Sequence, residues 1–324
     1  MTPPVPPHPS STMRPSTFAS PRRLRALMAG SALFVATAAQ AAPFRYVEDR
    51  APAIVDPLFT TTMGEARLNE LLFDGLFTDD RQLATVPSLA KGIQVSADRT
   101  SADVDLRSDV QWHDGKPFTS ADVVFTIRAM KEPKTLSPEG ARVSWIDSVE
   151  ATGPHSVRLT FTGPQPSPAD RLHFKILPAH LFSGTVVRRD DPFHTRPIGT
   201  GPYRFERFET DHSVKLSPAT GGSRSSESIT EVVMREVSDK SYQAKLILYE
   251  SVEALVRVLP RDLAILQADR NVELYPYQTN SWWYVGFNQA SSPWDEPEVR
   301  EALSLLIDTR ALLSPVGTGH PVRG

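Results

Sequence analysis

Apolar residues recur along this chain at two spacings, one typical of helices and the other typical of strands. In residues 65–77 the helical spacing places Leu68, Leu71, Leu72 and Leu76 on one face. This pattern predicts an amphipathic helix over 65–77.

Residues 121–131 show the same helical spacing and are preceded by a capping signal. Thr119 or Ser120 can cap the first turn, and Asp122 lies in that turn, where the helix dipole favours a negative charge. Two further helices are expected over 240–249 and 297–313.

Strands are predicted where apolar and polar residues alternate, as they do in 102–107 and 156–162. Residues 203–208 and 212–217 form the pattern of a hairpin after a tight turn, and the polar residues 217–228 predict a flexible loop. Further strands are expected over 229–237, 272–277 and 283–288. Helix and strand signals alternate irregularly, so the sequence predicts a mixed α/β fold.

The first 41 residues have the pattern of a cleaved secretory leader. Arginines at 14, 22, 23 and 25 precede an apolar run of about a dozen residues, which is followed by the small-x-small motif Ala39-Gln40-Ala41. The run is shorter than the roughly 20 apolar residues that a membrane-spanning helix needs. We therefore expect cleavage after Ala41, export by the general route rather than the twin-arginine route, and no stable membrane insertion of the mature chain.

The composition restricts the cellular compartment in which the protein can act and the classes of partner that it can bind. The chain contains no cysteine, which excludes disulfides and a lipid-modified N-terminus. Removing the four leader arginines from 35 basic side chains leaves 31 against 38 acidic ones, a net charge of −7. A mildly acidic surface argues against nucleic acid as a partner. These features predict a soluble protein outside the inner membrane.

No residue pattern predicts catalysis or a metal site. His113 and Asp114 are adjacent on an extended segment, so their side chains point to opposite faces and cannot form a base and carboxylate pair. We expect them to be hydrogen-bonding residues of a turn at Asp114-Gly115. No serine lies in a nucleophile elbow, and the eight histidines lack metal-site spacing. No cofactor is predicted.

Two other motifs have structural interpretations. Gly199-Thr200-Gly201 lacks the spacing and the lysine of a phosphate loop, and Pro202 removes one amide, so it is expected to be a tight turn. Trp282, Trp283 and Tyr284 form the one aromatic cluster, for which core packing is the favoured interpretation. An exported α/β protein without an active site points towards binding.

Five ordered segments resemble the bacterial extracellular solute-binding proteins of family 5, which serve peptide-type ABC transporters. The first, over 87–128, includes PSLAKG, the alternating strand ending in LR, WHDG and the ADVVF helix. The others are LPAHLF at 177–182, PIGTGPYRFERF at 197–208, the Asp239 region with 252–260, and VGFNQASSPWDEPEVREALSLLIDTRALL at 285–313.

The resemblance implies a type II-like periplasmic binding protein fold with two lobes that close on a ligand. It places a first lobe at 42–285, with an inserted subdomain at about 80–195, and the opening of a second lobe at 286–324, with most of that lobe absent. Thr61, Met63 and Trp283 are the residues that it suggests for the ligand cleft. Ordinary loop or core roles remain open for all three.

The resemblance also implies a function: capture of an oligopeptide or similar solute in the periplasm and its delivery to an inner-membrane ABC permease. Nickel complexes, haem, sugars and opines remain alternative ligands. A truncated, binding-incompetent fragment of such a protein is the second interpretation, and a secreted hydrolase is the third. Because Leu303, Leu305, Leu306 and Leu312 would lie exposed on the last helix, we also expect the isolated chain to be poorly soluble.

Overall fold

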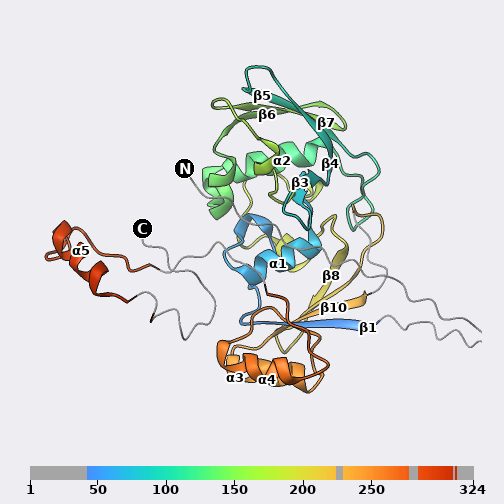
Figure 1. Ribbon diagram of the computed structural model, residues 1–324. Coiled ribbons are helices and arrows are strands. Elements are labelled where there is room, and N and C mark those ends of the chain that lie inside the picture. The colour runs from blue at the N-terminus through green and yellow to red at the C-terminus, as the bar shows by residue number, and fades with distance from the viewer. Residues whose placement is uncertain (1–41, 224–228, 277–283, 309–310, 312–324) are drawn as a thin grey trace, which may run out of the picture. The chain divides into compact units, whose positions relative to one another are not determined.

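A computed structural model describes residues 42–223, 229–276, 284–308 and 311 of the chain. They form the mixed α/β arrangement that the sequence predicts, with two larger sheets, a small two-stranded sheet and short helices between them (Figure 1). The predicted leader, including the cleavage site at Ala41, lies outside the described residues. Within the described part of the chain, no helix is long and apolar enough to cross a lipid bilayer.

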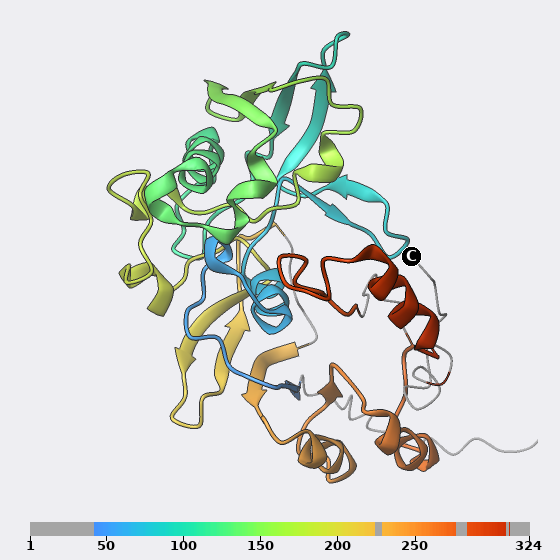
Figure 2. The same cartoon turned by 90° about the vertical axis from the view of Figure 1, so that its left-hand side faces the viewer.

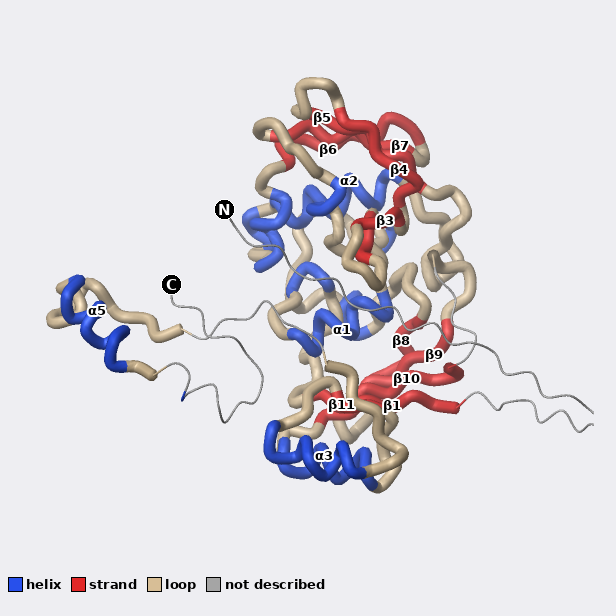
Figure 3. Tube along the Cα trace, viewed as in Figure 1, coloured by secondary structure: helices blue, strands red, loops and turns tan. Residues whose placement is uncertain are grey.

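The first sheet has five strands in the order β11-β1-β10-β9-β8 (Figure 3). Strand β1 pairs in parallel with β10 and β11, whereas β10, β9 and β8 pair antiparallel. The β8–β9 hairpin, yellow in Figure 2, confirms the predicted pairing across the turn. The bounds are β1 Ala42–Glu48, β8 Tyr203–Phe208, β9 Val214–Pro218, β10 Ile229–Glu236 and β11 Ala254–Leu255.

The second sheet is antiparallel, with four strands in the order β4-β5-β7-β6. Alternate residues of β5 and β7, such as Val104 and Leu159, are buried against the core, while Asp103 and Arg158 pair on the other face at 2.7 Å. The alternation predicted for both strands is therefore confirmed. The bounds are β4 Ala90–Val95, β5 Ser101–Leu106, β6 Ile146–Gly153 and β7 Ser156–Phe161; the small sheet pairs β2 Phe77–Asp79 with β3 Thr85–Pro87.

Helix α2, Ser120–Lys131, packs against β6 and β7 and confirms the predicted helix. Val123, Ile127 and Met130 lie on its buried face, as the helical spacing indicated. The Asp122 carboxylate accepts a hydrogen bond from the Thr119 N–H at 2.8 Å, so the predicted capping signal is also used.

Helix α1 spans Met63–Leu72, so the predicted end at residue 77 is wrong. The chain becomes extended at Phe73, and the Leu72 carbonyl accepts the N–H of Gly201 at 2.9 Å. Gly75 then forms an antiparallel bridge with Lys175. Contacts with segments more than 90 residues away along the chain thus stop a helix that the local spacing would continue.

Three further α-helices follow along the chain: α3 Lys240–Leu248, α4 Leu263–Ala268 and α5 Pro297–Leu306. Helix α3 agrees with the prediction, α4 was not predicted, and α5 ends seven residues before the predicted end at 313. The strands expected at 272–277 and 283–288 do not form in their described residues, 272–276 and 284–288. The lobe and subdomain boundaries expected from the resemblance remain predictions.

Candidate functional site

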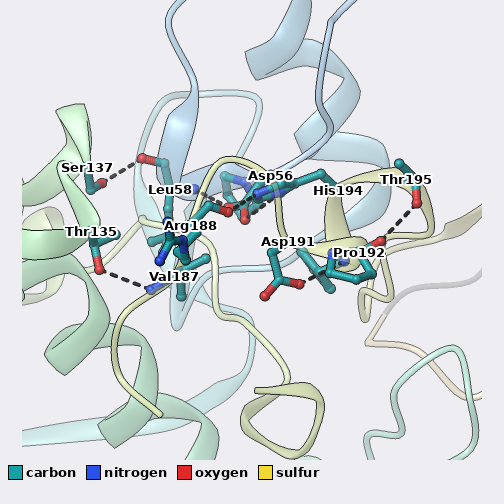
Figure 4. Close-up of polar contacts among 12 residues, drawn as sticks. Asp56, Leu58, Thr135, Ser137, Val187, Arg188, Asp191, Pro192, His194 and Thr195 are labelled. Carbon is teal, nitrogen blue, oxygen red and sulfur yellow. Dashed lines mark hydrogen bonds and ion pairs between the residues drawn. The ribbon is translucent and has the colours of Figure 1, made fainter. Parts of the chain in front are cut away.

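The segment from Asp56 to Met63 begins as a buried 3₁₀ turn and ends at the surface. Asp56 caps the turn Pro57–Phe59 by accepting the Leu58 N–H on Oδ1 at 2.7 Å. The Ser137 hydroxyl donates to the Leu58 carbonyl at 2.6 Å and so attaches the turn to the segment that follows α2 (Figure 4). Polar contacts within the interior therefore determine where the next residues emerge.

Those next residues expose their side chains at the N-terminus of α1. Glu65 accepts the Thr61 N–H, the Thr62 N–H and the Thr61 hydroxyl at 2.8, 3.0 and 3.1 Å, while the Thr62 hydroxyl accepts the Glu65 N–H. This capping box already places a carboxylate at the positive end of the helix. The Glu65 carboxylate thus caps the N-terminus of the helix. Thr61 and the side chain of Met63, which is 69% exposed, lie on the surface beside it.

Two of the three predicted cleft residues therefore lie together on one exposed segment. Thr61 is held by Glu65, and Met63 is the first residue of α1. Trp283 lies outside the described residues, and its neighbour Tyr284 is 88% exposed. A ligand-contacting role for Thr61, Met63 and Trp283 remains a prediction.

A buried ion pair lies beneath this segment. The Nδ1 atom of His194 is 3.1 Å from Oδ2 of Asp56, and both side chains are at most 2% exposed (Figure 4). Neither atom has another hydrogen-bond partner among the described residues. The second ring nitrogen, Nε2, lies 2.5 Å from the carbonyl oxygen of Arg188.

The pair has unusual electrostatics. Burial raises the pKa of Asp56, although hydrogen bonds from His194 and the Leu58 N–H act against this change. Burial alone would lower the pKa of His194, but its contacts with Asp56 and the Arg188 carbonyl outweigh that effect, so the His194 pKa is raised. Sequence reasoning missed His194, since no spacing relates it to Asp56.

His113 and Asp114 have the structural roles that the sequence predicts. The His113 ring accepts the Gly199 N–H on Nδ1 at 3.1 Å, and its Nε2 lies 3.0 Å from the Gly201 carbonyl. Asp114 pairs instead with His180 at 2.8 Å. The turn at Gly115 has φ of 83°, and burial lowers the pKa of His113. This histidine therefore anchors the 199–201 turn.

The 199–201 turn is packed too closely to hold a ligand. A Cβ at Gly199 would lie 1.7 Å from the Leu72 carbonyl oxygen. The Thr200 hydroxyl donates to the buried Asp74 carboxylate at 3.0 Å, and Ser223 donates to the same oxygen. This confirms that the motif is a structural turn. Among the described residues, no group of three or more histidine or acidic side chains could hold a metal ion.

Comparison with known proteins identifies the family. The model described as bacterial extracellular solute-binding proteins, family 5 Middle, matches residues 84–324. A Brucella ovis protein named "Putative ABC transporter peptide-binding protein" is 29% identical over 250 residues, covering 74% of this chain and 46% of the relative. The glutathione-binding protein GsiB of Salmonella typhi is 26% identical over 76% of this chain and 48% of its own length.

Solved structures of similar proteins support the same family fold. NikZ from Campylobacter jejuni, in complex with Ni(L-His), aligns with a TM-score of 0.77 and 26% identity, covering 84% of this chain and 54% of that protein. The oligopeptide-binding protein AppA of Bacillus subtilis, with a nonapeptide, aligns with the same TM-score at 21% identity. The expected periplasmic binding protein fold is thus confirmed. The chain spans about half the length of the relatives that it matches.

Proposed function

The chain belongs to the bacterial extracellular solute-binding proteins, family 5, and from this premise we propose that it is the solute-binding component of an ABC importer. The observation that carries the proposal is the family match over residues 84–324, most of the chain. The exposed Thr61–Met63 segment, supported by a buried turn, is a suitable place for ligand contact. The proposal covers capture of a solute and no catalytic step.

The proposed solute is a short peptide. Two sets of relatives support this class, since their names describe peptide binding and glutathione binding. A peptide also suits the chemistry of the segment, in which two exposed threonines precede the exposed apolar Met63 in the chain. A nickel–histidine complex is the second candidate, because NikZ, which carries one, shares 26% identity with this chain.

The proposed place of action is the periplasm, with an inner-membrane ABC permease as the partner. The support is the leader pattern of residues 1–41. Export of the full chain from a Gram-negative host should give a mature protein that begins at Ala42. N-terminal sequencing of the periplasmic fraction tests this, and an unprocessed chain in the cytoplasm would contradict it.

A calorimetric titration series tests the function. The purified mature chain is titrated with glutathione, a set of di- to nonapeptides, Ni(L-His) and an opine. Binding of peptides supports the proposal, whereas selective binding of Ni(L-His) favours the second candidate. Thr61→Ala and Met63→Ala should each weaken a genuine interaction, while the surface variant Arg158→Ala serves as the control.

Failure to bind any of these solutes would favour the binding-incompetent interpretation over the importer component. The secreted hydrolase interpretation is tested in the same samples by incubation with ester and peptide substrates. If product formation persists in every single-residue variant of the candidate nucleophiles, a contaminating enzyme is the source. Product formation lost in such a variant would overturn the binding proposal.

A further inference from the structure

The Asp56–His194 pair combines deep burial with an unusual arrangement of acceptors. The His194 ring lies between two oxygen atoms, Oδ2 of Asp56 at 3.1 Å and the carbonyl of Arg188 at 2.5 Å. A carbonyl only accepts hydrogen bonds, and so does an ionised carboxylate. Both ring nitrogens can therefore be satisfied only when the pair holds one proton more than neutral His194 and ionised Asp56 would require.

Within the described ranges of the chain, no other group competes for that extra proton. Apart from their mutual contact at 3.1 Å, Asp56 Oδ2 and His194 Nδ1 have no hydrogen-bond partner among the described residues. The charged groups around the ring are Asp191, which caps the 3₁₀ turn that carries His194, and the neighbouring Arg188 and Arg189. Arg188 pairs with Asp190 at 3.4 Å, and Arg189 stacks over Phe59, so neither replaces the histidine as the carboxylate's partner.

The pair is linked directly to the segment proposed to contact ligand. Oδ1 of Asp56 accepts the Leu58 N–H, and the Asp56 carbonyl accepts the Phe59 N–H at 3.1 Å. The Phe59 ring meets the His194 ring edge to face, with 5.6 Å between centroids. A change at the pair must therefore move, or loosen, the turn from which Thr60–Met63 continue.

We propose that His194 is a positioning residue for the ligand segment, and that the proton it shares with Asp56 holds residues 57–63 in place. This inference rests on the proposed function, because the segment that His194 positions is the one proposed to contact the solute. When the proton is lost, one of the two ring contacts becomes a contact between two acceptors. Such a contact is repulsive in a buried site, so the segment becomes more mobile.

Asp56→Asn provides a test with the opposite sign. The asparagine Oδ1 can still accept the Leu58 N–H, while its Nδ2 can donate to the Nδ1 of a neutral His194. In this variant all contacts are satisfied without the extra proton, and protonation of His194 creates a clash between two donors. The variant should therefore be ordered at high pH and loosened at low pH, the reverse of the native chain.

The measurement is amide hydrogen exchange of Leu58 and Phe59 over pH 5–9 in the mature chain. Rates are expressed as protection factors, which remove the intrinsic pH dependence of exchange. In the native chain protection should fall about tenfold towards high pH, the size expected for loss of one charge-assisted hydrogen bond. His194→Gln should give low protection with no change across this range.

Asp239→Asn is the matched control, because Asp239 caps α3 at an exposed site by accepting the Ser241 N–H. It should leave the Leu58 and Phe59 profiles unchanged. Equal profiles in the native chain and in Asp56→Asn would overturn the proposal, as would a native profile that does not depend on pH. Exchange needs no ligand, so these results stand even if the titrations find no solute.

The link to binding is tested separately with glutathione as the probe. If glutathione binds, its affinity should fall towards high pH in the native chain and towards low pH in Asp56→Asn. A common pH dependence in both proteins, together with opposite exchange profiles, would overturn the role of His194 in positioning the segment for ligand.

Discussion

The half-buried His113 and the buried His194 have opposite electrostatic properties. His113 lies between a donor, the Gly199 N–H, and an acceptor, the Gly201 carbonyl, so the neutral ring with its proton on Nε2 satisfies both. His194 lies between two acceptors, so both of its contacts are satisfied only when one extra proton lies between Nδ1 and Asp56 Oδ2. Burial lowers the pKa of His113, whereas its partners raise the pKa of His194 despite burial.

The comparison shows that burial alone does not decide the charge of an interior histidine. The identity of the two neighbouring atoms decides it, because a donor can be matched by a lone pair and an acceptor cannot. The fully satisfied histidine lies at a tightly packed structural turn. The one that depends on an extra proton lies beneath the segment proposed to contact solute.

The largest expected effect is a loss of stability at the 199–201 turn, which His113 anchors. In Gly199→Ala the new Cβ would lie 1.7 Å from the Leu72 carbonyl oxygen, a backbone atom that cannot move without displacing the end of α1. We expect a loss of about 3 kcal/mol or more in the free energy of unfolding. Urea titration followed by circular dichroism measures it.

Gly163→Ala is the control for this substitution, since nothing lies within 4 Å of its added Cβ. It should change the stability by less than about 1 kcal/mol. Equal stability of the two variants would show that the 199–201 turn is not packed as described.

A second prediction compares the aspartates of the two regions. Asp122 accepts the N–H groups of Thr119 and Ala179 at 2.8 Å and the Trp112 indole N–H at 3.3 Å, so both its oxygens face donors. Asp122→Asn turns an amide NH₂ towards one of these donors and should cost about 2 kcal/mol.

Asp56→Asn should cost less than about 1 kcal/mol at pH 8, because neutral His194 can accept from the new amide. Thermal or urea unfolding of both variants at this pH measures the difference. A larger loss in Asp56→Asn than in Asp122→Asn would contradict the assignment of donors and acceptors.

The third prediction concerns the pH dependence of stability. The raised pKa of His194 stabilises the fold below its unfolded value of about 6.5, and this contribution is lost as the pH rises through the folded pKa. The lowered pKa of His113 has the opposite effect, since stability is lost as the pH falls below about 6.5. These two histidines therefore favour maximal stability near pH 6.5.

Stability curves of two variants separate these contributions. His194→Gln should flatten the alkaline side of the curve, and His113→Gln should flatten the acidic side. The measurement is the urea midpoint at half-unit steps of pH. If either variant altered the side assigned to the other, the opposite protonation of the two rings would be wrong.

The smallest expected effect concerns the exposed leucines of helix α5. Leu305 and Leu306 on α5 are 66% and 80% exposed, in agreement with the apolar stripe predicted for this helix; Leu303 is half-buried, and Leu312 lies outside the described residues. Leu305→Lys should change the free energy of unfolding by less than about 0.5 kcal/mol.

The same substitution should reduce self-association of the chain, because an exposed apolar patch promotes contact between copies. Size-exclusion chromatography of the native chain and the variant checks this expectation. A monodisperse native monomer would contradict the predicted poor solubility.

Local sequence predicted the elements whose stabilising contacts are themselves local. The cap of α2 is an example, because Thr119 and Asp122 are three residues apart and form the same contacts in any helix start. The β8–β9 hairpin is another, since its turn and strand alternation lie within one short segment. Thr61 and Met63, by contrast, are suggested only by the family resemblance, and the capping box that Glu65 forms beside them was not predicted.

Distant contacts decided what the sequence alone did not show. The local spacing predicted a helix to residue 77, but the 199–201 turn and Lys175 end it at Leu72. The parallel pairing of β1 with β10 joins residues 42–48 to residues 229–236, which are far apart along the chain.

Sequence alone therefore determined the chemistry that each residue brings: a family signature, an α/β pattern and a segment with threonine hydroxyls. It did not determine the protonation of the histidines. His113 and His194 have the same side chain, and only the tertiary structure places one ring between a donor and an acceptor and the other between two acceptors. A proton's free energy depends on the atoms a few ångströms away, and folding brings those atoms from distant parts of the chain.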